Sequence, residues 1–499
     1  MSVPQDDLLL PGPVLDEHRW RVVTVALAVG AASAWLALPT IFDRGPAGVG
    51  LMVLFAAPLV VMLSGGKIFG TPPSRPAALL FWGALALVPW LALRAAPGLI
   101  ALDLAAAVAL AAVGLYRYRS DTPRVGVSDH LRIVFWAPFA VLVEPLRFVR
   151  DDIDGAGATM RQRSSRYRAI ARGLVLAVVP VLVFGTLLAS ADAAFSEIVG
   201  SLFGLDVGGL IEFVGLLAAV AWVIVGMLRF SAGRRPLFEI PRDMGYLGAT
   251  EVVTVLGSLA AMFALFVGIQ FAYLFGGGDY IRRTTGLTTA EYYRQGFFQL
   301  VAVAALVALL VLVLDWWHRD PHRAPGKAVT VLFEFLIALT AVMVMSALVR
   351  LAVYMDSFGI SRLRVYTAAF VIWIAVILIV LGVFVVRGRR DRFAPAAIVA
   401  AFAVVMGLNL LNPDALIARV NIDRHLETGA ELDLDYLGTL SDDAVPAMVG
   451  RADGPLCPDL KTLAIEIAGE DDRGGLRTYN RAHHRADAAV ARIRLADPC

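Results

Sequence analysis

Charged residues are scarce in this sequence: Asp, Glu, Lys and Arg make up only 17% of its 499 residues, and 59% are hydrophobic. Soluble domains carry about 25% charged and roughly 45–50% apolar residues. The balance therefore excludes an ordinary soluble domain and requires lipid around most of the chain. Because the arginines are spread over short loops and form no single basic face, we also expect no nucleic-acid partner.

Motifs of common enzymes are missing as well. No P-loop or dinucleotide-binding glycine motif occurs, and all seven histidines lie outside the long apolar runs. His318 and His322 have the i, i+4 spacing of a zinc pair, but Pro321 interrupts any helix between them. We therefore expect no metal and no other cofactor, and we favour a protein that is not an enzyme.

Cysteine occurs only twice, at Cys457 and Cys499, in the polar C-terminal part of the chain. A disulfide between them would close a loop of roughly 40 residues and stabilise the fold by about 3–4 kcal/mol. Such a bond requires that this part lie outside the reducing cytoplasm. Two free thiols are the equal alternative.

Long uncharged runs dominate the chain up to residue 411. A bilayer core of about 30 Å needs roughly 20 apolar residues per helix. Eleven runs of that order are predicted spans: 22–42, 48–64, 77–93, 98–116, 170–190, 209–229, 250–275, 296–314, 328–349, 365–386 and 393–411. The apolar stretch 131–143 is shorter and contains Pro138, so we interpret it as an interfacial or re-entrant helix.

Lysine and arginine are unevenly divided between alternate loops. One side of the predicted spans carries most of them, chiefly in the basic loop 117–169. Cytoplasmic loops hold this excess in membrane proteins, so we expect the N-terminus inside and the C-terminus outside. The predicted fold is an all-α polytopic bundle of about eleven spans in a bacterial inner membrane, with membrane lipids as partners.

Three regions follow: a cytoplasmic tail (1–21), a transmembrane domain (22–411) and a small helical extracytoplasmic domain (412–499). Asn412, Pro413 and Asp414 carry the signals of an N-cap, a first helical position and an acidic first turn, so a helix is predicted up to Gly429. Further helices are predicted after Ser441 and over 459–468 and 476–495. This domain either binds an extracytoplasmic protein partner or caps the bundle.

Ionisable residues inside spans are costly and are the first functional candidates. Glu334 lies about two turns into the ninth predicted span. It would bind a proton or a cation, pair with a basic residue, or make a structural hydrogen bond to a neighbouring helix. Asp103 lies near the end of a predicted span, and we attribute it to the hydrated headgroup region.

A second polar group collects at the outer ends of the predicted spans. Glu291 and Arg294 are three residues apart, so they share a helix face and can pair. Arg350 lies in an apolar run and needs a partner, which Glu291 or Asp356 can supply. Such residues form either a pocket for an anionic or lipid-linked ligand or an ion-pair lattice between helices. The candidate ligand-binding residues are Glu291, Arg294, Glu334, Arg350, Tyr354, Arg362 and Arg364.

Four segments carry a family resemblance: residues 291–300 (Glu-Tyr-Tyr-Arg-Gln-Gly-Phe-Phe-Gln-Leu), 191–192 (Ala-Asp), 358–366 and 412–437. Together they resemble a bacterial membrane family known only as a domain of unknown function, over roughly residues 170–450. The resemblance implies a polytopic helical fold and the placement of the C-terminal domain. It implies no activity and no functional residues.

These observations favour a non-enzymatic, transporter-like or sensor-like membrane protein with a polar pocket on its outer face. One alternative is a scaffold that acts through residues 412–499. Another is an intramembrane enzyme that acts on lipid-linked envelope intermediates, with Glu291 or Glu334 as its general base.

Overall fold

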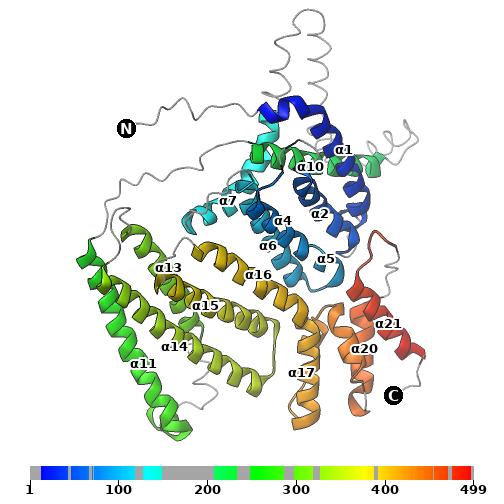
Figure 1. Cartoon of the computed structure of the whole chain (residues 1–499). Helices are drawn as coiled ribbons and strands as arrows, with labels where there is room; N and C mark the ends of the chain where they lie inside the picture. Colours follow the sequence, from blue (N-terminus) through cyan, green and yellow to red (C-terminus); the bar gives the residue numbers. More distant parts are fainter. Residues whose placement is uncertain are drawn as a thin grey trace, which may run out of the picture.

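The computed structural model describes residues 13–42, 47–66, 70, 72–118, 127–148, 207–232, 248–285, 297–318, 326–386, 392–452, 454–469 and 475–495. Within these ranges every regular element is a helix, which confirms the all-α class (Figure 1). The helices fall into two lobes, a connecting helix and a C-terminal group.

The first lobe is the blue, cyan and green group at the top of Figure 1. Its helices are α1 (Pro13–Ile41), α2 (Val49–Leu63), α4 (Arg75–Leu87), α5 (Trp90–Leu93), α6 (Pro97–Tyr116), α7 (Val127–Arg147) and α10 (Val207–Ala232). They pack around one apolar core, in which Phe81, Leu87, Leu91 and Ile224 are almost completely buried. Burial of such side chains holds the lobe together.

The second lobe comprises α11 (Ala249–Thr285), α13 (Phe297–His318), α14 (Lys327–Phe358) and α15 (Arg362–Val386). Its separate core includes Leu256, Phe333 and Leu378. The helix α16 (Phe393–Leu411) runs between the lobes (Figure 1). Its Phe393 belongs to the core of the second lobe and its Val405 to the core of the first. One helix therefore ties the two cores together.

Residues 413–495 form the C-terminal helices: α17 (Pro413–Thr428), α18 (Leu434–Gly438), η5 (Asp442–Ala444), α19 (Val445–Val449), η6 (Gly454–Leu456), α20 (Cys457–Ala468) and α21 (Arg481–Leu495). Ile417 and Leu460 of this group share an apolar core with Leu99 of α6 and Val365 of α15. The C-terminal helices thus pack on both lobes at once.

Eight of the described helices are long and apolar enough to cross a membrane, which makes the chain a multi-pass membrane protein. They correspond to the predicted runs 22–42, 77–93, 98–116, 209–229, 250–275, 328–349, 365–386 and 393–411. The runs 48–64 and 296–314 match the shorter apolar helices Val49–Leu63 and Leu300–Val311, and 170–190 lies outside the described residues. The count of eleven spans stays a prediction.

The helices α11 and α14 continue well past their predicted C-terminal ends. The helix α14 continues past residue 349 to Phe358, because no proline or glycine interrupts it before Gly359, whose φ is 73°. The helix α11 continues past residue 275 to Thr285, through three consecutive glycines.

Gly226 lies where α10 closely approaches α7, since a Cβ at this position would collide with the carbonyl oxygen of Val141. We expect Gly226→Ala to cost about 1–3 kcal/mol through overpacking. Gly257 in α11 has no heavy atom within 4 Å of its Cβ position, so Gly257→Ala is the matched control. Thermal unfolding in detergent measures both, and equal midpoints would contradict the close packing of α7 on α10.

Candidate functional site

One end of the membrane helices is covered by the C-terminal helices, and we call this contact the junction. Asn421 of α17 makes two hydrogen bonds, each 2.9 Å long, to Ile360 in the turn between α14 and α15. Its Oδ1 accepts from the Ile360 N–H, and its Nδ2 donates to the Ile360 carbonyl. The N–H of Val49, at the start of α2, donates to the Tyr479 carbonyl at 3.0 Å. Turns from both lobes therefore meet the C-terminal helices at the junction.

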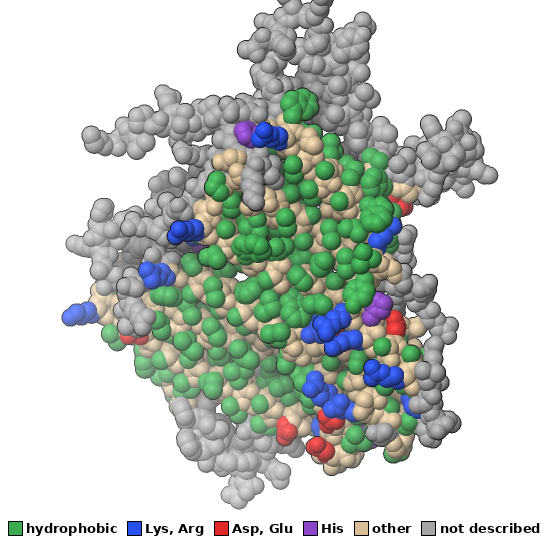
Figure 2. All heavy atoms as spheres, turned by 45° about the vertical axis from the view of Figure 1, so that its right-hand side comes forward, with side chains coloured by type: hydrophobic (Ala, Val, Ile, Leu, Met, Phe, Trp, Pro, Cys, Tyr) green, Lys and Arg blue, Asp and Glu red, His purple; other side chains and the backbone are tan. Residues whose placement is uncertain are grey.

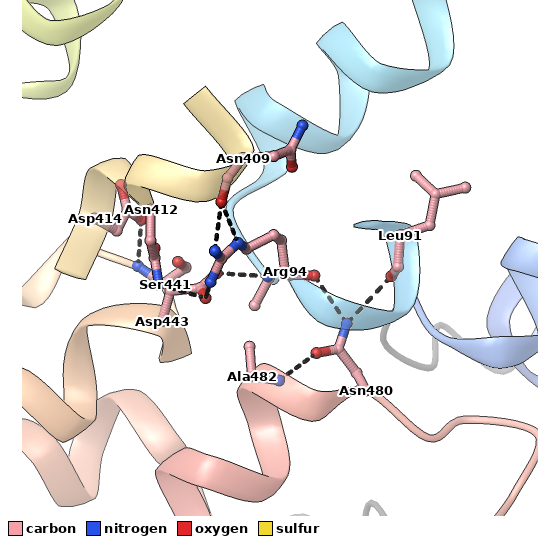
Figure 3. A network of polar contacts seen from close by, with 10 residues as sticks. Leu91, Arg94, Asn409, Asn412, Asp414, Ser441, Asp443, Asn480 and Ala482 are labelled. Atoms are coloured by element: carbon pink, nitrogen blue, oxygen red, sulfur yellow. Dashed lines mark hydrogen bonds and ion pairs between the residues drawn. The ribbon is translucent and has the colours of Figure 1, made fainter. Parts of the chain in front are cut away.

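Arg94, at the end of α5, holds the first lobe to the junction (Figure 3). Its guanidinium pairs with Asp443 at 3.3 Å and donates from Nε to the Asn409 carbonyl at 3.0 Å. Asp443 also accepts from the Ala95 N–H at 2.7 Å and from Asn412 Nδ2 at 3.1 Å. One carboxylate therefore joins α5, the end of α16 and the C-terminal helices.

Arg362, at the start of α15, makes the corresponding contact from the second lobe. Its guanidinium donates two hydrogen bonds to Asp414, at 2.9 and 2.6 Å, in the bidentate geometry that makes such pairs strong. The Asp414 side chain is completely buried and also accepts from the Ser441 N–H at 2.9 Å. The two lobes are thus fixed to the C-terminal helices through separate ion pairs.

Asn480 adds a third attachment. It is 1% exposed, and the two hydrogens of its Nδ2 are shared among the carbonyls of Ala47, Leu91 and Arg94, at 2.6, 3.2 and 2.8 Å. Its Oδ1 accepts from the Ala482 N–H at 2.8 Å and so caps α21 (Figure 3). A single side chain therefore caps one helix and satisfies carbonyls of the first lobe.

Asp414 and Asp443 have opposite pKa shifts. At Asp414, burial would raise the pKa, but hydrogen bonds from Arg362 and Ser441 outweigh it and hold the pKa below its ordinary value. At Asp443, burial outweighs the Ala95 N–H and the nearby Arg94 and raises the pKa. Asp414 is therefore firmly held as a carboxylate, whereas Asp443 takes up a proton more readily.

A cavity of about 490 Å³ opens at the junction, between the end of α16 and the C-terminal helices. Four arginines from separate elements share its lining with two acids and two leucines. These residues are Arg94, Arg419, Arg451, Arg485, Asp442, Asp443, Leu410 and Leu411. Figure 2 shows basic side chains gathered over the C-terminal helices, beside the broad apolar surface of the membrane helices.

The arginines of the cavity differ in their contacts. Arg94 is bound to Asp443, and Arg451 donates to Asp423 at 2.9 Å. Arg419 and Arg485 are exposed and make no hydrogen bond or ion pair with any residue that the structure describes. Two guanidinium groups at the cavity are therefore available to a ligand.

The cavity also has an apolar rim. Leu410 and Leu411, in the last turn of α16, are 69% and 46% exposed. They end a helix that is long and apolar enough to span a membrane. The cavity therefore lies where a hydrocarbon surface gives way to cationic groups.

The site residues predicted from the sequence are only partly gathered by the structure. Arg364 lies 4.4 Å from the centre of the Tyr354 ring, but Arg362 binds Asp414 instead. Arg350 is buried in α14. Glu334 is half-buried on the same helix, roughly 36 Å before its junction end at 1.5 Å per residue.

Three further residues of that set cannot be placed. Glu291 and Arg294 lie outside the described residues, so the predicted outer pocket stays a prediction. Cys457 is buried at the start of α20, while Cys499 also lies outside the described residues. The disulfide therefore stays a prediction too.

The structure gives two residues near the junction roles that differ from those predicted from the sequence. Asp103, attributed above to the hydrated headgroup region, is only 1% exposed, so that interpretation is wrong. It is buried because α16 and the C-terminal helices cover its end of α6. Asn412 follows α16 as expected, but its side chain donates to Asp443 and does not cap α17. The proline that follows it was a usable signal for the start of α17.

Comparison with known proteins gives one match. A family model described as a domain of unknown function (DUF4153) matches residues 77–450. No curated protein and no solved structure matches the chain. The matched range contains both ion pairs of the junction and most of the cavity lining, but not Arg451, Asn480 or Arg485.

Removing Arg362 leaves the buried Asp414 without its cation. We expect Arg362→Leu to lower the free energy of unfolding at neutral pH by about 3–5 kcal/mol, as for other broken buried pairs. Chemical denaturation in detergent micelles measures it. Arg451→Leu is the control, because its exposed pair with Asp423 is worth at most about 1 kcal/mol. Equal losses would contradict a structural role for the buried pair.

The same pair predicts a pH dependence. The folded pKa of Asp414 lies below its unfolded value, so its stabilisation is complete above about pH 4 and is lost as the pH falls through the folded pKa. We expect the difference between the wild-type protein and Arg362→Leu to shrink on acidification. A difference that stays constant between about pH 7 and about pH 3 would contradict this.

Proposed function

The chain belongs to the family described as a domain of unknown function (DUF4153), and we propose that it is a multi-pass membrane receptor for a phosphate-bearing anion. The observation that carries this proposal is the cavity at the junction, where four arginines from separate elements converge. Of the two roles favoured by the sequence, it supports the sensor-like one.

The hydrogen-bonding capacity of the cavity favours an anion. Both acids of the lining already have partners: Asp443 pairs with Arg94, and Asp442 with His483. The N–H donors of Arg419 and Arg485, by contrast, are not used by any described residue. A guanidinium presents several N–H donors in a planar fork, which matches the oxygens of a phosphate. A cation would find no unengaged carboxylate among the lining residues, so a phosphate group fits best.

The apolar rim favours a phosphate that is attached to a lipid. Leu410 and Leu411 extend from the last turn of a membrane helix, at the depth where headgroups meet acyl chains. Basic pockets between membrane helices bind anionic headgroups by this combination of charge and apolar contact. Inorganic phosphate offers the same oxygens without the chain, so the two sources are separable by experiment.

The proposal includes eleven spans in a bacterial inner membrane, with the N-terminus inside and the junction outside. The contacts of Val49, Ala95 and Ile360 bring the turns before α2, α6 and α15 to the C-terminal helices. These turns belong to the side of the chain that is poor in lysine and arginine. The opposite ends of α4 and α6 lie beside the basic loop 117–169. There the N–H of Ser74, just before α4, donates to the carbonyl of Tyr118, just after α6. The basic-residue rule then assigns the junction to the outside.

Transport is a second candidate, because the protein has two lobes with separate apolar cores and one connecting helix. Alternating access commonly moves one bundle against another. The ion pairs that attach both lobes to the C-terminal helices instead favour a fixed arrangement. The C-terminal helices share an apolar core with Leu99 and Val365 of the two lobes. This packing favours a function in which they act together with the lobes, and it disfavours a separate scaffold.

Ligand binding at Arg485 can be tested with a matched pair of substitutions. We expect Arg485→Gln to weaken binding of phosphatidic acid to the purified protein at least about tenfold, since a hydrogen bond between charged groups contributes roughly 1.5–3 kcal/mol. Arg492→Gln removes the same charge two turns farther along α21, outside the cavity lining, and should leave binding unchanged.

Further ligands identify the source of the anion. Diacylglycerol, which lacks the phosphate, should not bind, and inorganic phosphate should bind more weakly than phosphatidic acid. Equal binding of inorganic phosphate would assign the cavity to a free anion. Equal losses in the two arginine variants, or no binding by the wild-type protein, would overturn the proposed site.

The orientation has its own test. Alkaline phosphatase fused after Cys499 should be active, because this enzyme matures only outside the cytoplasm. A fusion after residue 318, in a loop assigned to the inside, is the matched control and should be inactive. The reverse pattern would place the junction in the cytoplasm.

A further inference from the structure

The end of α6 that faces the junction contains a buried acid that the anion cavity does not use. Asp103 is 1% exposed, and its Oδ1 accepts a hydrogen bond from Nδ2 of Asn409 at 2.6 Å. Asn409, on α16, is completely buried. Figure 3 shows its side chain pointing away from Arg94, which is bound to its backbone carbonyl. We call this contact between α6 and α16 the seam.

Two oxygens of the pair are left without a partner. Asp103 Oδ2 and Asn409 Oδ1 are both buried, and neither has a hydrogen-bond partner among the described residues. Both atoms are acceptors if Asp103 is ionised, so neither can satisfy the other. Unpaired buried acceptors are rare in folded proteins, and each one costs free energy. A single proton on Oδ2 would supply the donor that Asn409 Oδ1 lacks.

The surroundings do not supply a free cation for an ionised Asp103. Arg94 acts on it electrostatically, but its guanidinium is bound to Asp443 and to the Asn409 carbonyl. From α15, Tyr366 faces the pair beside Gly98, and Arg362 is bound to Asp414. The described part of α16 has no ionisable residue. An isolated carboxylate in an apolar helix bundle is expensive, so the neutral acid is favoured.

We propose that Asp103 and Asn409 form a proton-binding site at the seam. The site holds one proton on Asp103 Oδ2 and shares it with Asn409 Oδ1, so that two hydrogen bonds join the carboxylic acid to the amide. When the proton leaves to water, one of these bonds is lost and a negative charge remains in the seam. The proton therefore strengthens the contact of α6 with α16.

This site acts on the attachment of the connecting helix α16 to the first lobe. The helix α16 is packed in both apolar cores, through Phe393 in the second lobe and Val405 in the first. Asp103 belongs to the first lobe, so a proton at the seam favours the arrangement in which α6 and α16 are joined. This inference needs no ligand in the cavity, and its failure would leave the proposed function untouched.

The first test compares Asp103→Asn with the wild-type protein in nanodiscs. An asparagine reproduces the acid–amide pair with an N–H donor and cannot ionise. The folded wild-type protein retains a proton that the unfolded chain releases above about pH 4, so its stability falls as the pH rises. We expect the unfolding midpoint of the variant to depend less on pH, and to exceed that of the wild-type protein at about pH 8. Asp356→Asn, an exposed acid at the end of α14, is the control and should keep the wild-type dependence.

The second test does not depend on the folding of the variant. A protonated carboxyl group has an infrared C=O stretch that a carboxylate lacks, so the wild-type protein should show this band at neutral pH. The band should be lost on alkaline titration and should persist in Asp356→Asn. Its absence at neutral pH would overturn the proposal. So would a variant Asp103→Asn that is less stable than the wild-type protein at every pH, because Asp103 would then be required as an anion.

Discussion

Charges that are buried beside an apolar helix bundle must be paired, and the arrangement of this protein depends on that constraint. Arg94 and Arg362 each find their carboxylate in the C-terminal helices, at Asp443 and Asp414, although they belong to different lobes. Separating the partners would leave a buried charge uncompensated, which is far more costly than losing an exposed pair. The C-terminal helices therefore fix the ends of the two lobes relative to each other, with Asn480 adding neutral hydrogen bonds to the first lobe.

The cavity and the seam are consequences of the same attachment. Arg94 lines the cavity, pairs with Asp443 and binds the backbone carbonyl of Asn409, whose side chain bonds to Asp103. A continuous set of contacts thus joins the basic cavity to the acid in the membrane helices. A ligand that shifts Arg94 would act directly on the peptide group of Asn409. Such a connection suits a receptor, in which occupancy at the surface must alter the packing of the spans.

Apolar periodicity and turn signals predicted the helical class, the positions of eight spans and the start of α17 at Pro413. The junction could not be predicted in this way, because its partners are far apart in the sequence. Arg94 and Asp443, for example, are separated by 349 positions. The sequence alone assigns Asp103 to a hydrated span end, since nothing local shows that the C-terminal helices cover that end. Arg362 was recognised as a candidate, but its partner Asp414 looked like an ordinary acid of a first helical turn.

Amide hydrogen exchange of the wild-type protein in nanodiscs tests most directly whether the C-terminal helices are a fixed part of the membrane fold. If the buried pairs attach them to both lobes, the amides of α17 and α21 should exchange as slowly as those of α6 and α15, through a common opening. The account would be contradicted if the amides of α17 and α21 exchanged faster, through a separate opening, while those of α6 and α15 stayed protected. The C-terminal helices would then be an independently moving domain, and the junction would not be a permanent site.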